Sequence, residues 1–205
     1  MDLTNFIDIS MDLNEKTLVW TADPQPELRP ILRQPEDPVN FTWLDFSCHA
    51  GSHVDAPFFL FQDGWKSDEI PLERLLGDCV VVDLTDVEDT IRVEDFENKT
   101  LAERVLLKTQ NSFDPLEKYN PEHVDLSPEA AEFLLYAGVK TLGYDYQSFE
   151  RDGRNVIHDI FLSQSVTIID NLRLAKTEER TYTLVCLPIK LTGIDAAPCR
   201  ALLFS

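Results

Sequence analysis

The stretch His49-Ala50-Gly51-Ser52-His53-Val54-Asp55-Ala56-Pro57 places two imidazoles and one carboxylate within seven residues. His49, His53 and Asp55 have the same strand parity, but four residues of straight strand span about 13 Å, too far for ligands of one metal ion. Gly51 can adopt the backbone angles of a sharp turn, and the proline at the end disfavours a helix. The stretch therefore predicts a bent loop that leaves a strand and holds a divalent cation. The alternative is a group of ordinary capping or surface residues.

Two later residues complete the candidate ligand set. A helix is expected over 155–162, with His158 on it, and Asp170 ends an apolar strand that begins at Val166. A carboxylate buried at the end of a strand needs a polar partner. If the two elements pack beside the first three ligands, five ligands suit two metal ions with one bridging carboxylate.

Composition sets bounds on the class of protein. The 205 residues, 43% of them hydrophobic, predict a single domain over 1–205 with a sizeable core. The net charge of -19 is unfavourable for binding nucleic acid or an anionic membrane surface, and no apolar run approaches the roughly 20 residues of a membrane span. The first basic residue is Lys16, so no export signal is expected, and four cysteines without a CxxC pair predict reduced thiols and a cytoplasmic location.

The pattern of apolar runs predicts a mixed α/β fold. Ser127, Pro128 and Gly138 are typical of the two ends of a helix, which is expected over 128–137. Two proline-containing or long connections, 23–38 and 111–127, are interpreted as loops. The order of elements predicts one domain with a mixed central sheet. Strands are expected over 41–47, 79–84, 104–109, 141–145, 166–170 and 182–189, and further helices over 155–162 and 91–98.

At these residues the chain resembles the cyclase family of metal-dependent hydrolases, whose best-known members are bacterial kynurenine formamidases. The family pattern HxGTHxDxPxHF is matched at 49–57, with Ser52 in place of threonine. Further similarity covers most of the chain, at Asp8 to Ser10, Trp20 to Pro24, His158 to Leu172, Leu187 to Lys190 and Asp195 to Arg200.

This resemblance implies a swivelling β/β/α fold, a centre of one or two metal ions, hydrolysis of a small amide such as N-formylkynurenine, and a homo-oligomer. Carried over residue by residue, it implies that His49, His53 and Asp55 hold the first ion. Asp55, His158 and Asp170 would hold the second, with Asp55 bridging. Zinc is the expected metal, and manganese is an alternative because imidazole and carboxylate ligands suit both.

Two residues depart from the family pattern. Asp170 stands where the family has glutamate, so its side chain is one methylene shorter. Phe59 stands where the family has its last motif histidine, which looks like the family's acid/base. A phenyl ring cannot move a proton, and general acid–base help typically contributes 10²–10⁴-fold. The catalytic residue therefore stays unassigned.

Three functions remain open: a metal-dependent amidase, a pseudoenzyme that binds metal or ligand, and a lyase or dehydratase on the same scaffold. Trp20, Phe59 and Trp65 are candidate substrate-binding residues, with ordinary core packing as the alternative for each. His123 is interpreted as a solvated loop residue, and Cys48 as a buried neighbour of the motif rather than a ligand.

Overall fold

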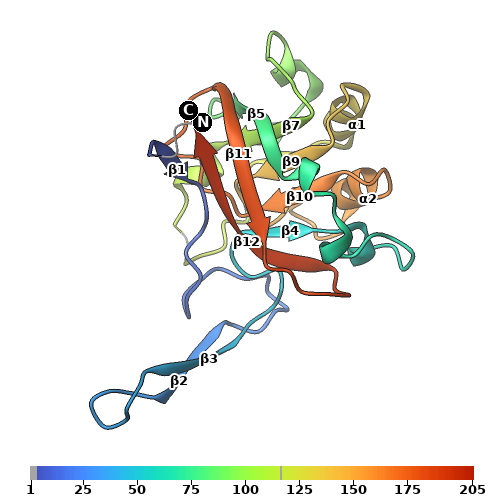
Figure 1. The fold of residues 1–205 in the computed structure, drawn as a ribbon. Helices are drawn as coiled ribbons and strands as arrows, with labels where there is room; N and C mark the ends of the chain where they lie inside the picture. The colour runs from blue at the N-terminus through green and yellow to red at the C-terminus, as the bar shows by residue number, and fades with distance from the viewer. Residues whose placement is uncertain (1–3, 116) are drawn as a thin grey trace.

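The computed structural model describes residues 4–115 and 117–205. Its main sheet closes on itself: the strand order β12-β11-β5-β7-β9-β10-β4 returns to β12 (Figure 1). Strand β1 pairs with the C-terminal part of β12. The strands of this sheet are β1 (Phe6–Asp8), β4 (His53–Asp55), β5 (Leu76–Asp83), β7 (Arg104–Lys108), β9 (Thr141–Tyr144), β10 (Thr167–Asp170), β11 (Arg180–Pro188) and β12 (Ala196–Phe204).

The sheet mixes two strand directions. Strands β5, β7, β9 and β10 run parallel, whereas β4 is antiparallel to both of its neighbours, β10 and β12. Five of the predicted strands lie in this sheet, and the predicted mixed α/β fold is confirmed. The single-domain boundary at 1–205 stays a prediction, since residues 1–3 and 116 lie outside the described part of the chain.

Both faces of the sheet are buried, which explains the continuous β-branched run of β5. Val80 and Val82 pack into one core cluster with the helices, while Cys79 and Val81 pack into a second cluster enclosed by the sheet. Successive side chains of a strand point to opposite faces. A strand with apolar residues at every position therefore needs apolar partners on both sides.

Two α-helices cover one side of the sheet (Figure 1): α1 (Pro128–Tyr136) and α2 (Val156–Leu162). The side chain of Ser127 accepts a hydrogen bond from Ala130 N, and Gly138 takes a positive φ of 86° after the last turn. Both ends of α1 are therefore as predicted. The expected helix over 91–98 is wrong in type, because only a 3-10 helix forms there. The 3-10 helices are Pro57–Phe59, Ser67–Glu69, Leu72–Arg74, Val93–Phe96 and Gln110–Phe113.

A two-stranded hairpin extends away from the body of the molecule (Figure 1). It consists of β2 (Glu27–Leu32) and β3 (Phe41–Asp45), so the prediction of a plain loop over 23–38 is wrong. Pro30 is tolerated in β2 because the ribbon has open edges, and the register shifts beside this proline. The strand expected over 41–47 exists as β3, but it lies outside the main sheet.

A third small sheet pairs β6 (Thr90–Ile91) with β8 (Asp125–Leu126) in parallel. Among the described residues, no helix has the length and apolar character needed to cross a membrane.

Candidate metal centre

The motif stretch bends before it enters a strand, rather than after leaving one as predicted. Gly51 takes a φ of 69°, a region that favours glycine. The Ser52 hydroxyl donates to Asn171 O at 2.7 Å and accepts from Met11 N at 2.7 Å, so it fixes the bend to two other segments. Strand β4 then begins at His53 and ends at Asp55, and all three of its residues are buried.

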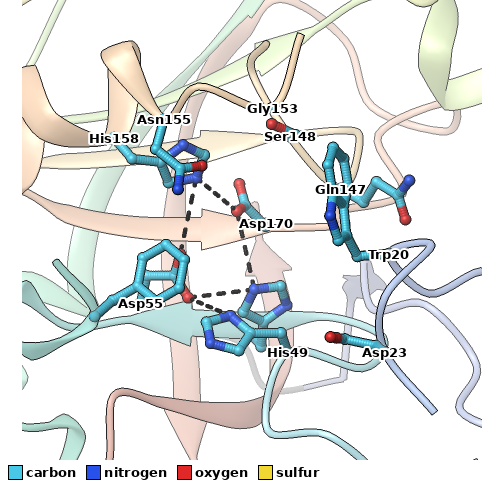
Figure 2. Close-up of a pocket in the computed structure, with 12 residues that line it drawn as sticks. Trp20, Asp23, His49, Asp55, Gln147, Ser148, Gly153, Asn155, His158 and Asp170 are labelled. Carbon is cyan, nitrogen blue, oxygen red and sulfur yellow. Dashed lines mark ion pairs between the residues drawn. The ribbon is translucent and has the colours of Figure 1, made fainter. Parts of the chain in front are cut away.

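Strand pairing brings Asp170 to the motif. In the antiparallel pair of β4 and β10, Asp170 lies opposite His53. His158 reaches the same point from α2, with Nε2 3.6 Å from Asp170 Oδ2 and 3.9 Å from Asp55 Oδ2. The predicted convergence of the two late residues with the motif is therefore observed (Figure 2).

Asp55 lies between the imidazoles. Its Oδ1 is 3.1 Å from His49 Nδ1 and 3.3 Å from His53 Nε2, and its Oδ2 faces His158. Two overlapping groups result, His49–His53–Asp55 and Asp55–His158–Asp170, and within each group the potential ligand atoms lie within 4.8 Å of one another. The geometry thus allows the predicted bridging position of Asp55.

In each histidine of this cluster, the ring nitrogen that points away from the cluster contacts an oxygen of a neighbouring residue. His53 Nδ1 is 2.9 Å from the Gly51 carbonyl oxygen, and His49 Nε2 is 2.8 Å from Asp195 Oδ2. His158 Nδ1 is 3.0 Å from Glu150 Oε2. Outer acceptors of this kind fix the tautomer and the ring orientation of metal-binding histidines. All three imidazoles therefore direct a nitrogen into the cluster.

Glu150 holds more than the ring of His158. Its Oε1 also accepts hydrogen bonds from the backbone N–H groups of Ile157 and His158, and its Oε2 accepts from the Ser148 hydroxyl. These N–H groups belong to the first turn of α2, where Asn155 makes no side-chain cap. One buried carboxylate thus caps the helix and orients its histidine. Sequence analysis missed this role, since no motif spacing distinguishes Glu150 from the other acidic residues.

In the metal-free cluster, the pKa values of several side chains are shifted strongly from their ordinary values. Burial disfavours the imidazolium of His49, but contacts with Asp55, Cys48 and Asp195 outweigh it and raise its pKa to about 12. Burial likewise acts against His158, while Asp170 and Glu150 raise its pKa to about 10. Burial and the nearby charge of Asp55 raise the pKa of Asp170. The carboxylates around these imidazoles therefore favour positive charge at the site.

Unsatisfied oxygens support the same conclusion. Among the described residues, Asp170 Oδ1 is buried and accepts no hydrogen bond, and Asp55 Oδ1 has only the ion-pair contacts with His49 and His53, which lack hydrogen-bond geometry. A buried polar atom without a partner is costly. Imidazole nitrogens and carboxylate oxygens are common ligands of Zn²⁺, with distances of about 2.0–2.2 Å. The residues present therefore fit a divalent cation.

A cavity of about 200 Å³ opens beside the cluster, and its wall is formed largely by loops. Phe59, on a 3-10 helix, faces this cavity with its ring centroid 4.8 Å from that of His49 and 6.1 Å from that of His158. Trp20 also lines it and packs against Gly153, where an added Cβ would lie 3.1 Å from the indole. Asp23 contributes a carboxylate on the same side (Figure 2).

Other predictions about individual side chains need correction. Trp65 does not line this cavity; it lies at a separate hollow with neighbours such as Lys66. His123 is buried rather than solvated, and its ring stacks on Tyr146 at 4.3 Å between centroids. Cys48 is only half-buried and has its sulfur 3.6 Å from Asp195 Oδ1.

Comparison with known proteins identifies the family of this chain. The sequence model of the family described as "Putative cyclase" matches residues 7–151. The chain belongs to the cyclase family. It is 33% identical to a kynurenine formamidase of Salinibacter ruber over 203 residues, 96% of each chain. It is 29% identical to the kynurenine formamidase of Bacillus cytotoxicus, with 99% of each chain covered.

Solved structures show the same family relationship. A structure described as a "predicted metal-dependent hydrolase" from Bacillus stearothermophilus aligns with a TM-score of 0.84 and 33% identity over 97% of each chain. An isatin hydrolase aligns with a TM-score of 0.80 but only 18% identity, covering 97% of this chain and 91% of the other, and so shows a shared fold alone. The cyclase-family fold expected from the motif residues is therefore confirmed.

Proposed function

We propose that this cyclase-family protein is a metal-dependent hydrolase that cleaves the C–N bond of a small aryl amide, with N-formylkynurenine as the leading substrate. The convergence of His49, His53, Asp55, His158 and Asp170 beside a cavity carries this proposal. Relatives named kynurenine formamidase, similar along nearly the full chain, support the amide substrate.

The proposed cofactor is one or two divalent ions, Zn²⁺ first and Mn²⁺ second. His49, His53 and Asp55 would hold one ion, and Asp55, His158 and Asp170 the other. When bound, such an ion lowers the pKa of a water molecule towards 7 and polarises a carbonyl group. Asp195, Glu150 and the Gly51 carbonyl keep the imidazoles in the orientation that binding needs.

The cavity wall would bind the organic part of the substrate. Trp20 offers an indole face to a flat aromatic ring, and Phe59 adds an apolar surface close to the cluster. Hydrolysis of a formamide adds water, releases formate and leaves a proton on the departing amine nitrogen. Phe59 cannot deliver this proton. Outside the five-residue cluster, Asp23 is the one ionisable side chain among the described lining residues, so it is the candidate that would transfer it.

The position of Phe59 also favours a second candidate, a pseudoenzyme that binds metal and ligand without turnover. The test is hydrolysis of N-formylkynurenine by metal-free protein reconstituted with Zn²⁺ or Mn²⁺. Formate release that requires the ion and is lost in His53→Ala supports the hydrolase. Stoichiometric metal binding without turnover of any aryl formamide or lactone supports the pseudoenzyme, and turnover by elimination without water uptake would indicate a lyase or dehydratase.

We also infer that the protein forms a homo-oligomer through the hairpin of β2 and β3. Phe41, Trp43, Leu44 and Ile31 are exposed on this ribbon. An isolated two-stranded hairpin is only marginally stable in water. A second copy that covers the apolar side chains would stabilise it. Light scattering should show more than one chain per particle, and Trp43→Glu should reduce the mass to that of a monomer.

The cytoplasmic location also stays a prediction.

A further inference from the structure

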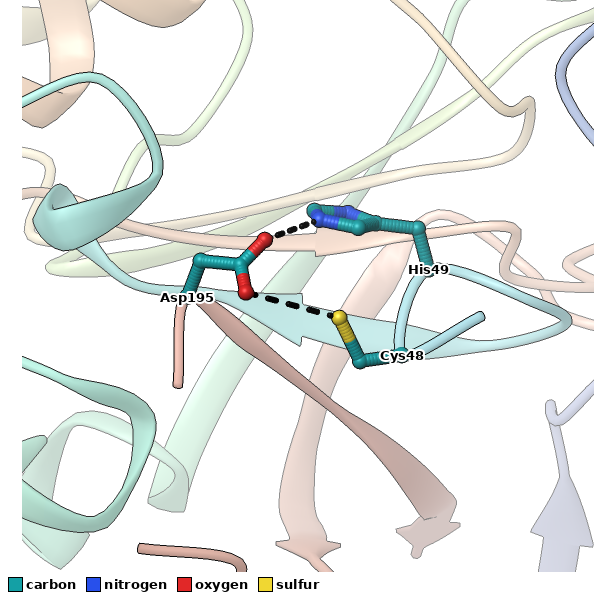
Figure 3. Close-up of side chains that lie close together, drawn as sticks. All are labelled: Cys48, His49 and Asp195. Atoms are coloured by element: carbon teal, nitrogen blue, oxygen red, sulfur yellow. Dashed lines mark hydrogen bonds and ion pairs between the residues drawn. The ribbon is translucent and has the colours of Figure 1, made fainter. Parts of the chain in front are cut away.

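Cys48, His49 and Asp195 lie together on the outer side of the ligand cluster (Figure 3). Cys48 and His49 belong to the bend before β4, and Asp195 directly precedes β12. Strands β12 and β4 pair, and the Asp195 carbonyl oxygen accepts a hydrogen bond from Ala56 N at 2.9 Å. The pairing of the two strands therefore fixes the carboxylate of Asp195 beside the bend.

One carboxylate contacts both other side chains. Asp195 Oδ2 is 2.8 Å from His49 Nε2, and Oδ1 is 3.6 Å from Cys48 Sγ. The sulfur, the nitrogen and an oxygen lie within 4.8 Å of one another. Sulfur, imidazole nitrogen and carboxylate oxygen are the three ligand types of Zn²⁺, at about 2.3, 2.0–2.1 and 2.0–2.2 Å. Only small side-chain movements would place all three around one ion.

This group differs from the inner cluster in exposure and in ligand chemistry. The side chains of His49 and Asp195 are 22% and 36% exposed, whereas those of His53 and Asp55 are 3% and 2% exposed. An ion can therefore reach the outer group directly from solvent. Soft thiolate sulfur favours Zn²⁺ and other thiophilic ions over Mn²⁺ or Mg²⁺. The charge of -19 on the chain attracts cations in general.

We propose that Cys48, His49 and Asp195 form an outer site for a thiophilic divalent cation, Zn²⁺ or Cd²⁺, which is separate from the inner centre but shares His49 with it. His49 is suited to this sharing because Nδ1 faces Asp55 while Nε2 faces Asp195. Binding displaces the thiol proton and the Nε2 proton into solvent. Three protein ligands leave the fourth position of a tetrahedral ion to water. The outer site does not depend on the hydrolase activity proposed above.

The test uses the full chain with the inner centre first saturated with Mn²⁺. Cd²⁺ is then titrated while the ultraviolet charge-transfer band of cadmium thiolate is recorded. The expected result is one band that saturates at one Cd²⁺ per chain. Cys48→Ser should abolish it, and the matched variant Cys199→Ser, at another half-buried cysteine, should retain it. Asp195→Asn should weaken Cd²⁺ binding at least about tenfold, since a charged ligand is lost.

Three outcomes would overturn the proposal: no band in the wild type, a band that persists in Cys48→Ser, or unchanged affinity in Asp195→Asn. A measurement on the wild-type chain avoids any folding defect of the variants. Cd²⁺ should protect Cys48 from alkylation by iodoacetamide, as mapped by mass spectrometry. Equal alkylation with and without Cd²⁺ would also exclude the site.

The shared histidine gives a second readout that does not require turnover. Cd²⁺ bound at His49 Nε2 would repel the inner ion that the same ring binds through Nδ1. The Cd²⁺ concentration that releases the inner Mn²⁺ should therefore be lower for the wild type than for Cys48→Ser. The electron paramagnetic resonance signal of free Mn²⁺ measures this release. Identical release curves would show that His49 is not shared.

Discussion

The two sides of the cavity are built in different ways. Four of the five candidate ligands come from the closed sheet and the helix beside it: β4, β10 and α2 fix His53, Asp55, Asp170 and His158. The fifth, His49, lies on the bend before β4. The opposite wall, with Trp20, comes from loops. A regular scaffold holds a metal site to tight geometry, whereas loops tolerate substitution. Phe59 lies on the short 3-10 helix after β4 and supplies no ligand atom, so the buried cluster stays complete with phenylalanine at this position.

The largest expected effect is on the cluster itself. His53→Ala removes a proposed inner ligand and leaves Asp55 and Asp170 without one of their positive partners. We expect metal affinity to fall by more than about 100-fold, beyond the range of outer-partner changes, and metal-dependent hydrolysis to disappear. Elemental analysis checks this result. His123→Gln, at the histidine outside the cluster, is the control and should keep its metal; equal loss in both variants would show general unfolding instead.

The next largest effect is expected on hydrolysis, from a substitution at Phe59 beside the cavity. Phe59→His places an imidazole where the phenyl ring now lies, with the phenyl centroid 4.8 Å from that of the His49 ring. If proton transfer limits the reaction, kcat/KM for an aryl formamide should rise by up to about 10²–10⁴-fold. Metal content should not change. The comparison is made at matched metal occupancy between about pH 6 and 9. Strong wild-type activity that the substitution leaves unchanged or lowers would show that another residue transfers the proton.

A smaller effect is expected at Glu150, which connects the scaffold to the cluster. Glu150→Gln would place an amide N–H where Oε2 now faces His158 Nδ1, so the acceptor that fixes the ring would be lost. We expect metal affinity to fall about 10–100-fold, and ¹⁵N NMR of His158 to report a changed tautomer. Glu97→Gln, on the surface, is the matched control. An unchanged tautomer with lowered thermal stability would mean that Glu150 only caps α2.

The smallest effect is a pH dependence of metal binding. His49 and His158 have pKa values raised to about 12 and about 10 without metal, so both are protonated at neutral pH. A cation must displace these protons, and apparent affinity should therefore rise with pH, by up to about tenfold per pH unit for each displaced proton. Calorimetry in buffers of different ionisation enthalpy measures the proton release. Binding without proton release would contradict the charge balance described for the cluster.

Sequence patterns predicted the elements that local chemistry determines. The β-branched run of β5 and the caps of α1 are such features, and the spacing of His49, His53 and Asp55 located the candidate ligands. The hairpin was missed because prolines usually exclude strands, and an open ribbon removes that restriction. The place of Trp65 depends on how a loop closes, through Phe58 N and the Trp65 carbonyl oxygen, which no local pattern encodes.

Contacts between residues distant in sequence could not be predicted either. Glu150 and Asp195 acquire their roles only when α2 packs beside β10 and β12 pairs with β4. The resemblance placed Asp195 within a matching stretch, but it gave no contact for its side chain. Register between strands, rather than residue type, decides which carboxylate meets which imidazole.

The central claim is that five residues from both halves of the chain form one metal centre. Crystals of the protein prepared with Zn²⁺, measured on both sides of the zinc absorption edge, test it most directly. The account predicts an anomalous peak within about 2.0–2.2 Å of ligand atoms of His49, His53 and Asp55, with a second peak among Asp55, His158 and Asp170 if two ions bind. Anomalous density absent from these five residues at full zinc loading would contradict it.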